Sequence, residues 1–221
     1  MTANRQVMVL MAHADDETLG CGGTISKLAA CGWDIQTVFV SSGIVTTRGA
    51  ANHDNREHAV QACSALGVPK PVFLRFEDQK FDAYPVAELC NEVLSLGIEP
   101  DLIFSHVGTD LNSDHRIVSE IAKVIGRPRT KPVTILGCEI PATSFWNAET
   151  FHGDLFVDIS YTLDRKIEAF SRYVNEIQEF PGPWSEDGLK LLARYHGMHA
   201  GLPAAEAFVV YRAYGEHLGD L

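Results

Sequence analysis

Three polar residues that could do chemistry, His13, Asp15 and Asp16, directly follow a short apolar run at residues 7–11. The run predicts a buried strand, and residues 18–31 after it predict a helix. In an open α/β fold the turn between them lies at the carboxyl edge of the sheet, where ligands bind. Crowding these polar groups together is costly unless a cation neutralises them. His13 and Asp16 suit a divalent metal such as zinc, which leaves Asp15 free to act as a base.

A third metal ligand is predicted in a second polar stretch, which follows the apolar run at residues 102–105. His115 begins the next predicted helix and would complete a His–Asp–His group, with open positions for water and substrate as in catalytic zinc sites. Asp114 could orient a ligand histidine or the substrate, or it could cap that helix. His106, at the end of the strand, is either catalytic or an ordinary buried histidine.

The elements that must position these residues alternate between apolar runs and helical patterns, which predicts right-handed βαβ units. The predicted fold is a single-domain, Rossmann-like α/β fold, with an open, twisted, mostly parallel sheet and helices on both faces. Asp54, with Glu57 three residues on, predicts a helix start, and Gly67 predicts its end. The predicted strands span residues 7–11, 35–40, 72–74, 102–105 and 133–136, and the predicted helices span 18–31, 55–66, 86–96 and 115–125.

The C-terminal third of the chain has a less regular pattern. We therefore expect one domain over residues 1–221, with a βαβ core at 1–138 and C-terminal cap elements at 139–221. These elements are a strand at 155–159, a helix from Thr162 to about residue 174, a helix capped by Ser185, and a last strand at 207–211.

Composition and charge restrict the partners of the chain. Its formal net charge of −11 argues against a nucleic-acid footprint and disfavours anionic membrane surfaces. No apolar stretch is long enough to span a bilayer, and the first apolar run is too short for a signal peptide. The five scattered cysteines lack CxxC spacing and suit buried thiols in a reducing compartment. We expect a cytoplasmic protein that binds neither nucleic acid nor membranes.

The segment Ala12-His13-Ala14-Asp15-Asp16-Glu17 resembles the His-Pro-Asp-Asp-Glu signature of the LmbE-like / PIG-L family of zinc-dependent N-deacetylases. Known members remove acetyl groups from amino sugars, including phosphatidylinositol-linked, thiol-cofactor and antibiotic glycosides. The resemblance implies that His13, Asp16 and His115 bind Zn²⁺, with other divalent metals as alternatives, and that Asp15 is the general base. It also implies a small N-acetylated sugar as substrate and, because family members are often oligomeric, a homo-oligomer. Residues 54–67, 76–78, 110–116 and 205–208 also look family-like, so the resemblance covers nearly the whole chain.

The chain departs from the family at Asn112, where many members have a histidine that stabilises the oxyanion or protonates the amine. An amide can donate a hydrogen bond to an oxyanion but cannot deliver a proton. Either Asp15 serves as both base and acid, or a histidine such as His106 or His199 supplies the proton. One family branch resembles residues 110–116 with asparagine included, so Asn112 is compatible with activity.

A second departure concerns the substrate pocket. That branch often reads Pro-His-Pro-Arg-Ser where this chain has Pro181-Gly182-Pro183-Trp184-Ser185, which predicts a pocket with less charge and more affinity for aromatic groups. Asp78 matches a family position that contacts substrate, or it caps a loop. Arg48 could hold a sugar hydroxyl, and His199 could contact the substrate. Both could equally be ordinary surface residues.

The predicted function is therefore zinc-dependent hydrolysis that removes an N-acetyl group from a small metabolite containing an amino sugar. Two alternatives are the hydrolysis of another amide, such as a thiol-sugar conjugate, and a non-catalytic metal- or sugar-binding homologue. A nucleotide-binding dehydrogenase is disfavoured, because Gly20, Gly22 and Gly23 do not form a GxGxxG fingerprint ahead of a helix.

Overall fold

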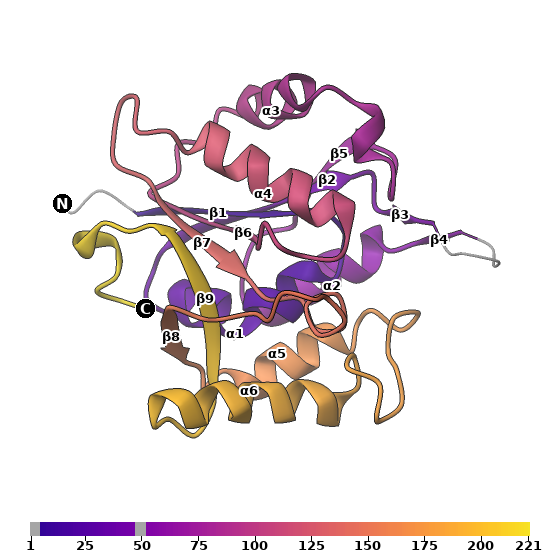
Figure 1. Ribbon diagram of the computed structural model, residues 1–221, viewed down its shortest axis with the longest axis vertical. Coiled ribbons are helices and arrows are strands. Elements are labelled where there is room, and N and C mark those ends of the chain that lie inside the picture. The colour runs from indigo at the N-terminus through magenta and orange to yellow at the C-terminus, as the bar shows by residue number, and fades with distance from the viewer. Residues whose placement is uncertain (1–4, 47–51) are drawn as a thin grey trace.

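The computed structural model describes residues 5–46 and 52–221. A seven-stranded sheet lies at its centre, with strands in the order β5-β2-β1-β6-β7-β9-β8 (Figure 1). Strands β5, β2, β1, β6 and β7 are parallel, whereas β9 is antiparallel to both of its neighbours. The prediction of a mostly parallel α/β sheet is confirmed. The strands of this sheet are β1 (Gln6–Met11), β2 (Asp34–Ser41), β5 (Val72–Phe76), β6 (Leu102–His106), β7 (Thr134–Cys138), β8 (Leu155–Asp158) and β9 (Ala205–Arg212).

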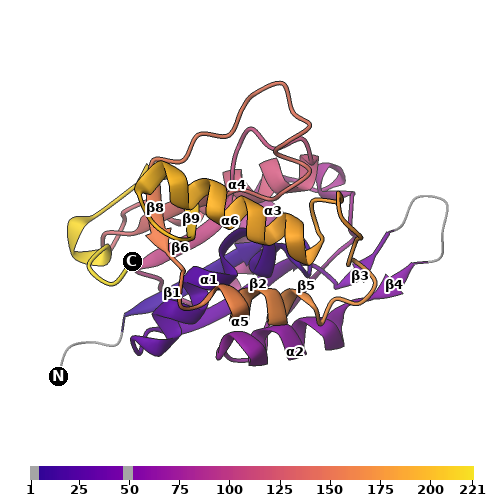
Figure 2. The same cartoon turned by 90° about the horizontal axis from the view of Figure 1, so that it is seen from below.

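Helices cover both faces of the sheet. Helices α3 and α4 lie on one side, and α1, α2, α5 and α6 lie on the other (Figures 1 and 2). A short hairpin of β3 (Ile44–Val45) and β4 (His53–Asp54) projects beyond the sheet. None of the helices in the two described ranges could cross a bilayer, since each is too short or too polar. The helices are α1 (Asp16–Ala30), α2 (Arg56–Leu66), α3 (Val86–Ser95), α4 (Ser113–Ile125), α5 (Leu163–Phe170) and α6 (Glu186–Ala200), with short turns η1 (Phe81–Ala83) and η2 (Gly215–His217).

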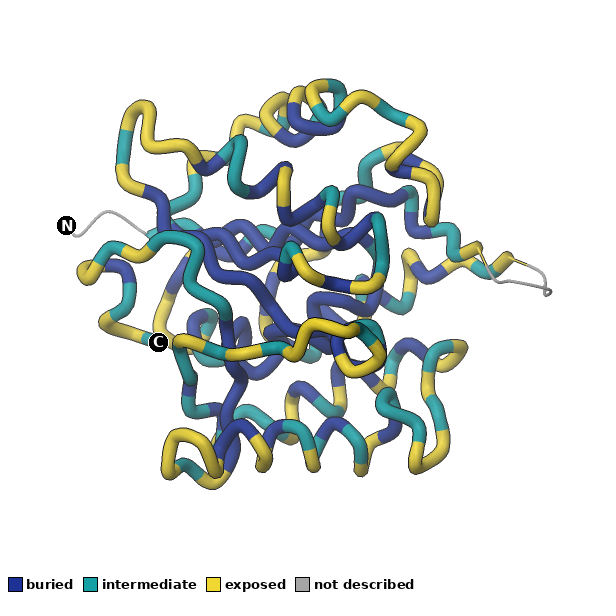
Figure 3. Tube along the Cα trace, in the orientation of Figure 1, coloured by how far each residue is buried: buried dark blue, intermediate teal, exposed yellow. Residues whose placement is uncertain are grey.

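The central strands are buried on both faces, as continuous apolar runs predict. In β1, Val7 and Val9 belong to the core on the α1 side of the sheet, whereas Met8 and Leu10 belong to the core on the α4 side. Figure 3 shows this buried interior, with most exposed residues on the outer helices and loops. Two hydrophobic cores therefore hold the sheet between its helix layers.

The strand order reverses between β1 and β6. From β1 the chain proceeds outward through β2 and β5, and it then returns to β6 and continues in the opposite direction to β7. At such a reversal the loops that follow the two central strands diverge and leave a crevice. Segments 12–16 and 107–115 border this crevice, and they contain the predicted metal ligands.

Helix α1 consists of two helical segments that meet at Cys21, whose φ of −147° is not helical. The carboxylate of Glu206 accepts hydrogen bonds from the backbone N–H of Gly23 (2.9 Å) and of the next residue (2.7 Å), so it caps the second segment. The ammonium of Lys166 donates to the carbonyl of Leu19 (2.8 Å) and to Glu206 (2.7 Å). A buried ion pair thus holds the bend in the helix.

The glycines of α1 serve close packing. A Cβ at Gly20 would lie 2.8 Å from the Cβ of Cys138, and a Cβ at Gly23 would lie 2.8 Å from the side chain of Ile159. Glycine at these positions lets α1 approach the sheet. The structure therefore gives these glycines a role other than binding a dinucleotide.

Two helix boundaries agree with the sequence predictions, and one cap position differs. Helix α2 ends at Gly67, which has a φ of 80°, and Ser185 caps α6 by accepting a hydrogen bond from a backbone N–H (3.0 Å). The cap position of α2 is Asn55, one residue after the predicted one, and its side chain makes no capping hydrogen bond. The carboxylate of Asp54 nevertheless accepts the backbone N–H of Arg56, the first residue of α2, at 3.0 Å, and it also pairs with the guanidinium of Arg56 at 2.6 Å.

The C-terminal elements complete the central sheet, since β9 pairs with β7 and β8 pairs with β9. Helix α5 follows Thr162 as predicted but ends at Phe170, several residues before the predicted end. The hydroxyl of Thr162 does not cap the helix and donates to the carbonyl of Gly23 at 2.8 Å.

Candidate active site

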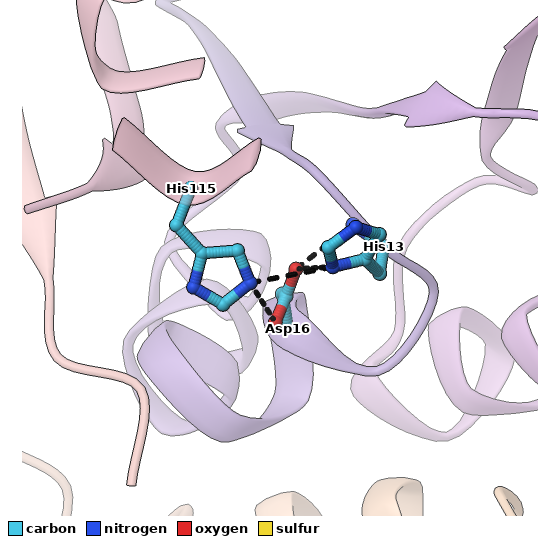
Figure 4. A group of neighbouring side chains, drawn as sticks. All are labelled: His13, Asp16 and His115. Atoms are coloured by element: carbon cyan, nitrogen blue, oxygen red, sulfur yellow. Dashed lines mark hydrogen bonds and ion pairs between the residues drawn. The ribbon is translucent and has the colours of Figure 1, made fainter. Parts of the chain in front are cut away.

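His13, Asp16 and His115 lie together in the crevice, as their positions after two central strands predict (Figure 4). Nδ1 of His13 lies 3.3 Å from Nε2 of His115 and 3.6 Å from Oδ2 of Asp16, and Nε2 of His115 lies 3.5 Å from Oδ1 of Asp16. Two zinc ligands at about 2.0–2.1 Å and a tetrahedral angle are about 3.3–3.4 Å apart. The spacing of the three side chains therefore suits one metal ion.

The other ring nitrogen of His13 faces two carboxylates. Nε2 lies 2.9 Å from Oδ1 of Asp78 and 3.2 Å from Oδ2 of Asp114. Burial would lower the pKa of His13, but the hydrogen bonds to Asp114 and Asp78 raise this pKa well above its usual value. The two carboxylates facing Nε2 assign a proton to that nitrogen. The raised pKa favours a second proton on Nδ1 in the metal-free protein, and a metal ion at Nδ1 would take the place of this proton.

The other ring nitrogen of His115 also faces a carboxylate, because its Nδ1 lies 3.2 Å from Oδ2 of Asp110, close enough for an ion pair but without hydrogen-bond geometry. Asp110 is itself fixed, since it accepts hydrogen bonds from the backbone of Asn112 (2.8 Å) and the hydroxyl of Thr143 (2.9 Å). A proton on Nδ1 leaves Nε2 of His115 with a lone pair. Nδ1 of His13 and Nε2 of His115 therefore face each other across 3.3 Å, where either a shared proton or a bound metal ion can join them.

The sequence predicts no individual role for Asp110. Its contact with Nδ1 of His115 gives it a role in metal binding that can be tested. In Asp110→Asn the amide can no longer favour the Nδ1–H form of His115, so we expect the affinity for zinc to fall by about 10–100-fold. Titration against a chelator of known affinity measures this change. Asp34→Asn, at an exposed position, should keep the parent affinity. Equal affinities for Asp110→Asn and the parent protein would contradict this role.

A second set of side chains, His13, Asp78 and Asp114, is also close enough to hold a cation. However, both oxygens of Asp114 accept backbone hydrogen bonds, from Gln79 at 2.8 Å and Phe81 at 3.2 Å. Asp114 is fully buried and serves to orient His13. This set is therefore a hydrogen-bonding shell behind the ligand group.

Asp114 does not cap helix α4, so one of its two sequence interpretations is excluded. Asn112 is the cap, and its Oδ1 accepts a hydrogen bond from the backbone N–H of Asp114 at 2.9 Å. Asn112 also lines the pocket in front of the ligand group. Its capping role uses the oxygen, so the two N–H donors of the amide are not needed for the cap.

Asp15 lies beside the ligand group without joining it, and it lines the same pocket. Its φ of 145° is a conformation that favours glycine, and its carbonyl is held by the hydroxyl of Thr18 at 2.7 Å. Burial and the nearby carboxylates of Asp16 and Glu176 raise the pKa of Asp15 well above its usual value. A carboxylate with a raised pKa next to a cation site is suited to accept a proton near neutral pH.

Glu17 lies beneath this turn and is completely buried. The hydroxyl of Tyr173 donates to its Oε1 at 2.6 Å, and the backbone N–H of Asp15 donates to its Oε2 at 3.2 Å. Burial raises the pKa of Glu17 to about 8, even though the hydrogen bond from Tyr173 acts in the opposite direction. Glu17 thus ties the turn to the segment that follows α5.

The raised pKa of Glu17 makes stability depend on pH. The folded protein keeps a proton up to about pH 8, whereas the unfolded chain releases it near 4.5. The free energy of unfolding therefore falls as pH rises through this window. We expect the fall between pH 5 and 9 to be roughly 3–5 kcal/mol smaller in Glu17→Gln, as measured by denaturant unfolding of metal-free protein. Glu57→Gln, an exposed substitution, should keep the parent slope, and the same slope in Glu17→Gln would refute the effect.

The pocket in front of the ligand group is small, with a volume of about 110 Å³. Asp15, Asp78 and Glu176 give it an acidic lining, and no Lys or Arg lines it within the described parts of the chain. Glu176 is held by Nε2 of His53 at 2.7 Å and by Nδ2 of Asn55 at 2.9 Å. Glu176 was not predicted, because nothing in its local sequence distinguishes it from other acids on the surface.

The sequence also predicts roles at the site for His106, His199 and Arg48. His106 is fully buried, its Nε2 accepts the backbone N–H of Ala12 at 2.9 Å, and its ring stacks on His115 at a centroid distance of 4.0 Å. Its Nε2 also lies 3.4 Å from Oδ2 of Asp16, and His106 does not line the pocket. This position favours the interpretation as a buried histidine, and a catalytic role for His106 stays a prediction. His199 is exposed on α6, stacks on Phe156 and does not line the metal pocket, which disfavours a contact with substrate there, and its substrate role stays a prediction. Arg48 lies outside the described residues.

A parallel α/β sheet with two histidines and a carboxylate converging at its carboxyl edge, beside a free carboxylate, is typical of metal-dependent hydrolases. Residues 8–125 match the family model described as PIG-L, GlcNAc-PI de-N-acetylase. The chain belongs to this family. The prediction of an N-deacetylase is confirmed at the level of the family.

Two curated relatives are named as deacetylases, which agrees with membership of this family. The "Uncharacterized deacetylase YaiS" of Escherichia coli is 29% identical over 150 residues, covering 64% of this chain and 78% of the relative. The diacetylchitobiose deacetylase of Thermococcus kodakarensis is 26% identical over 224 residues, covering 91% and 81%.

Solved structures share the fold. The N,N'-diacetylchitobiose deacetylase of Pyrococcus horikoshii, solved with an inhibitor, has a TM-score of 0.76 at 20% identity, covering 93% of this chain and 83% of that one. GalB of Pseudomonas putida, a 4-carboxy-2-hydroxymuconate hydratase, has a TM-score of 0.77 at 19% identity, covering 95% and 97%. The fold alone therefore does not select one reaction.

Proposed function

We propose that this protein is a zinc-dependent N-deacetylase that hydrolyses the acetamido group of a small, uncharged amino-sugar compound. The observation that carries the proposal is the convergence of His13, Asp16 and His115 at metal-ligand spacing beside the carboxylate of Asp15, which lies outside this group. His13, Asp16 and His115 would hold the metal. When bound, the metal would supply a Lewis acid that polarises the amide carbonyl and makes water more acidic.

Asp15 transfers the protons of the reaction, and Asn112 stabilises the negative charge that develops on the carbonyl oxygen. Asp15 takes a proton from the water molecule whose oxygen attacks the carbonyl carbon of the amide. The NH₂ group of Asn112 donates a hydrogen bond to the carbonyl oxygen as negative charge develops on it. As the C–N bond breaks, Asp15 passes its proton to the amine nitrogen, which releases acetate and a free amine. The burial of His106 and the distant position of His199 support Asp15 as both base and acid.

The acidic lining of the pocket supports a substrate without negative charge. Asp15, Asp78 and Glu176 would repel an anion, whereas their oxygens can accept hydrogen bonds from sugar hydroxyls. This lining disfavours the reaction of the hydratase neighbour, whose named substrate carries a carboxyl group. The named substrate of the curated relative, diacetylchitobiose, is an N-acetylated sugar and suits the pocket chemically.

A deacetylation assay tests the proposal directly. Metal-stripped protein is reconstituted with Zn²⁺, Co²⁺ or Mn²⁺ and incubated with N-acetylglucosamine, diacetylchitobiose and N-acetylated thiol-sugar conjugates, and free amine is measured. We expect about one metal ion per chain and amine release that requires metal. Release only from thiol conjugates would shift the substrate class, and metal binding without any turnover would favour a binding protein. Absence of bound metal after reconstitution would refute the proposal.

A further inference from the structure

A pocket of about 210 Å³ lies at the opposite edge of the sheet from the metal ligands. It is bordered by the C-terminal ends of α3 and α4, which cover the same face of the sheet, and by segments 98–100 and 127–133 (Figure 1). These segments lead into the parallel strands β6 and β7, whereas the metal ligands follow the ends of β1 and β6. We call this site the amino-edge pocket. Within the described parts of the chain, it shares no lining residue with the metal pocket.

The walls of the amino-edge pocket are mainly apolar. Leu94, in the last turn of α3, contributes a side chain that is 51% exposed. An apolar surface that is open to water in a concave site is suited to the hydrocarbon part of a ligand. The other apolar residues that line the pocket are Ile98, Pro100, Val124, Ile125 and Val133.

Positive charge surrounds these apolar walls, although the chain has a formal net charge of −11. Arg127, Arg129 and Lys131 all line the pocket. Glu99 is the only acidic residue that lines it within the described parts of the chain. Because Lys131 pairs with Asp101 at 2.7 Å, the positive charge available to a ligand comes mainly from the two arginines.

The two arginines have no acidic partner. Arg56 and Arg75, on other surfaces, each pair with a carboxylate at 2.6 Å. Among the residues that the structure describes, the side chain of Arg127 makes one hydrogen bond, from Nε to the carbonyl of Val124 at 2.9 Å, and the side chain of Arg129 makes none. A guanidinium group donates two parallel hydrogen bonds to a carboxylate or phosphate. Both groups are therefore available to an anion from outside the chain.

We propose that the amino-edge pocket binds a small amphiphilic anion, with a phosphate or carboxylate head and a short hydrocarbon chain. The guanidinium groups of Arg127 and Arg129 bind the oxygen atoms of the head, and the chain lies against Leu94 and Val124. The volume of about 210 Å³ is below the range of about 300–1,000 Å³ that is usual for drug-sized ligands, so the hydrocarbon chain must be short. This inference does not depend on the proposed deacetylation.

Calorimetric titration of the metal-loaded protein with hexyl phosphate tests this inference. Inorganic phosphate has only the head of this probe, and hexanol has only its chain. We expect hexyl phosphate to bind at least tenfold more tightly than either, because only hexyl phosphate engages both the arginines and the apolar walls. The affinity should fall as salt is added, since the arginines are exposed. Chelating the metal ion should leave the affinity unchanged.

Two substitutions at exposed positions of the pocket separate the two parts of the site. Arg129→Gln should weaken the binding of hexyl phosphate at least tenfold. Leu94→Gln should weaken it at least threefold while the binding of inorganic phosphate stays the same. The matched controls are Arg194→Gln and Leu111→Gln, at exposed positions outside the pocket, and both should keep the parent affinity.

Four results would overturn the inference. Unchanged affinity in Arg129→Gln would place the ligand elsewhere, and loss of binding on chelation would place it at the metal ion. Equal affinities for hexyl phosphate and inorganic phosphate would indicate an adventitious ion only. Sedimentation with phosphatidylglycerol vesicles, without binding of hexyl phosphate, would assign the arginines to a lipid surface. We expect the protein to remain in the supernatant in this last assay.

Discussion

Asp15→Asn is expected to lower kcat by about 10²–10⁴-fold while the protein keeps its metal ion. The amide retains the size of the carboxylate but cannot accept a proton from water or return one to the amine. Because Asp15 is outside the ligand group of His13, Asp16 and His115, metal affinity should change little. Metal content and deacetylation kinetics, measured on the same preparation, check both parts.

The matched control is Asp82→Asn, the same chemical change at an exposed position away from the pocket. It should retain the parent kcat. If Asp15→Asn keeps more than a tenth of the parent kcat, Asp15 is not the base, and Glu176 becomes the carboxylate to test next.

Lys166→Met is expected to lower the free energy of unfolding by about 3–5 kcal/mol. The substitution leaves the carboxylate of Glu206 buried without its cation, and it also removes the donor to the carbonyl of Leu19 at the bend of α1. Denaturant unfolding measures the loss. Because α1 begins at Asp16, we also expect weaker metal binding in this variant.

Two further variants show whether the loss comes from an unpaired buried charge. Glu206→Gln combined with Lys166→Met removes that charge and should recover part of the stability. Lys190→Met breaks an exposed ion pair with Glu186 and should change stability little. A double variant no more stable than Lys166→Met would indicate that packing, and not charge, accounts for the loss.

The fold and the ligand group could be predicted from the sequence because both follow from local patterns. Apolar runs placed His13 and His115 after parallel strands, and the carboxyl ends of parallel strands share one edge. The structure brings these residues together with Asp16, although the two histidines are 102 positions apart.

The supporting residues could not be predicted because their roles depend on tertiary contacts. Asp114 and Asn112 are both able to cap a helix, and the choice between them depends on the backbone N–H groups of Gln79 and Phe81, which engage Asp114. His106 has the residue type of a catalyst, but the packing of its ring against His115 removes it from the pocket. Strand periodicity contains no information on either outcome.

The roles of the C-terminal segments also depend on tertiary contacts and are only partly predictable from the sequence. The change to Pro183-Trp184 predicted a pocket that suits aromatic groups, and Trp184 does line the metal pocket. A second cavity of about 590 Å³ is bordered by residues from 139–151, from 180–183 and from helix α6. Because these segments are far apart in the sequence, no local pattern could reveal this cavity.

The backbone of Asp15 has a consequence for how this enzyme can evolve. Its φ of 145° suits glycine better than any residue with a side chain. A population selected in the laboratory only for heat tolerance would gain from glycine at position 15, and it would lose turnover in the same step. The aspartate in this chain therefore favours the reaction at the expense of thermal tolerance.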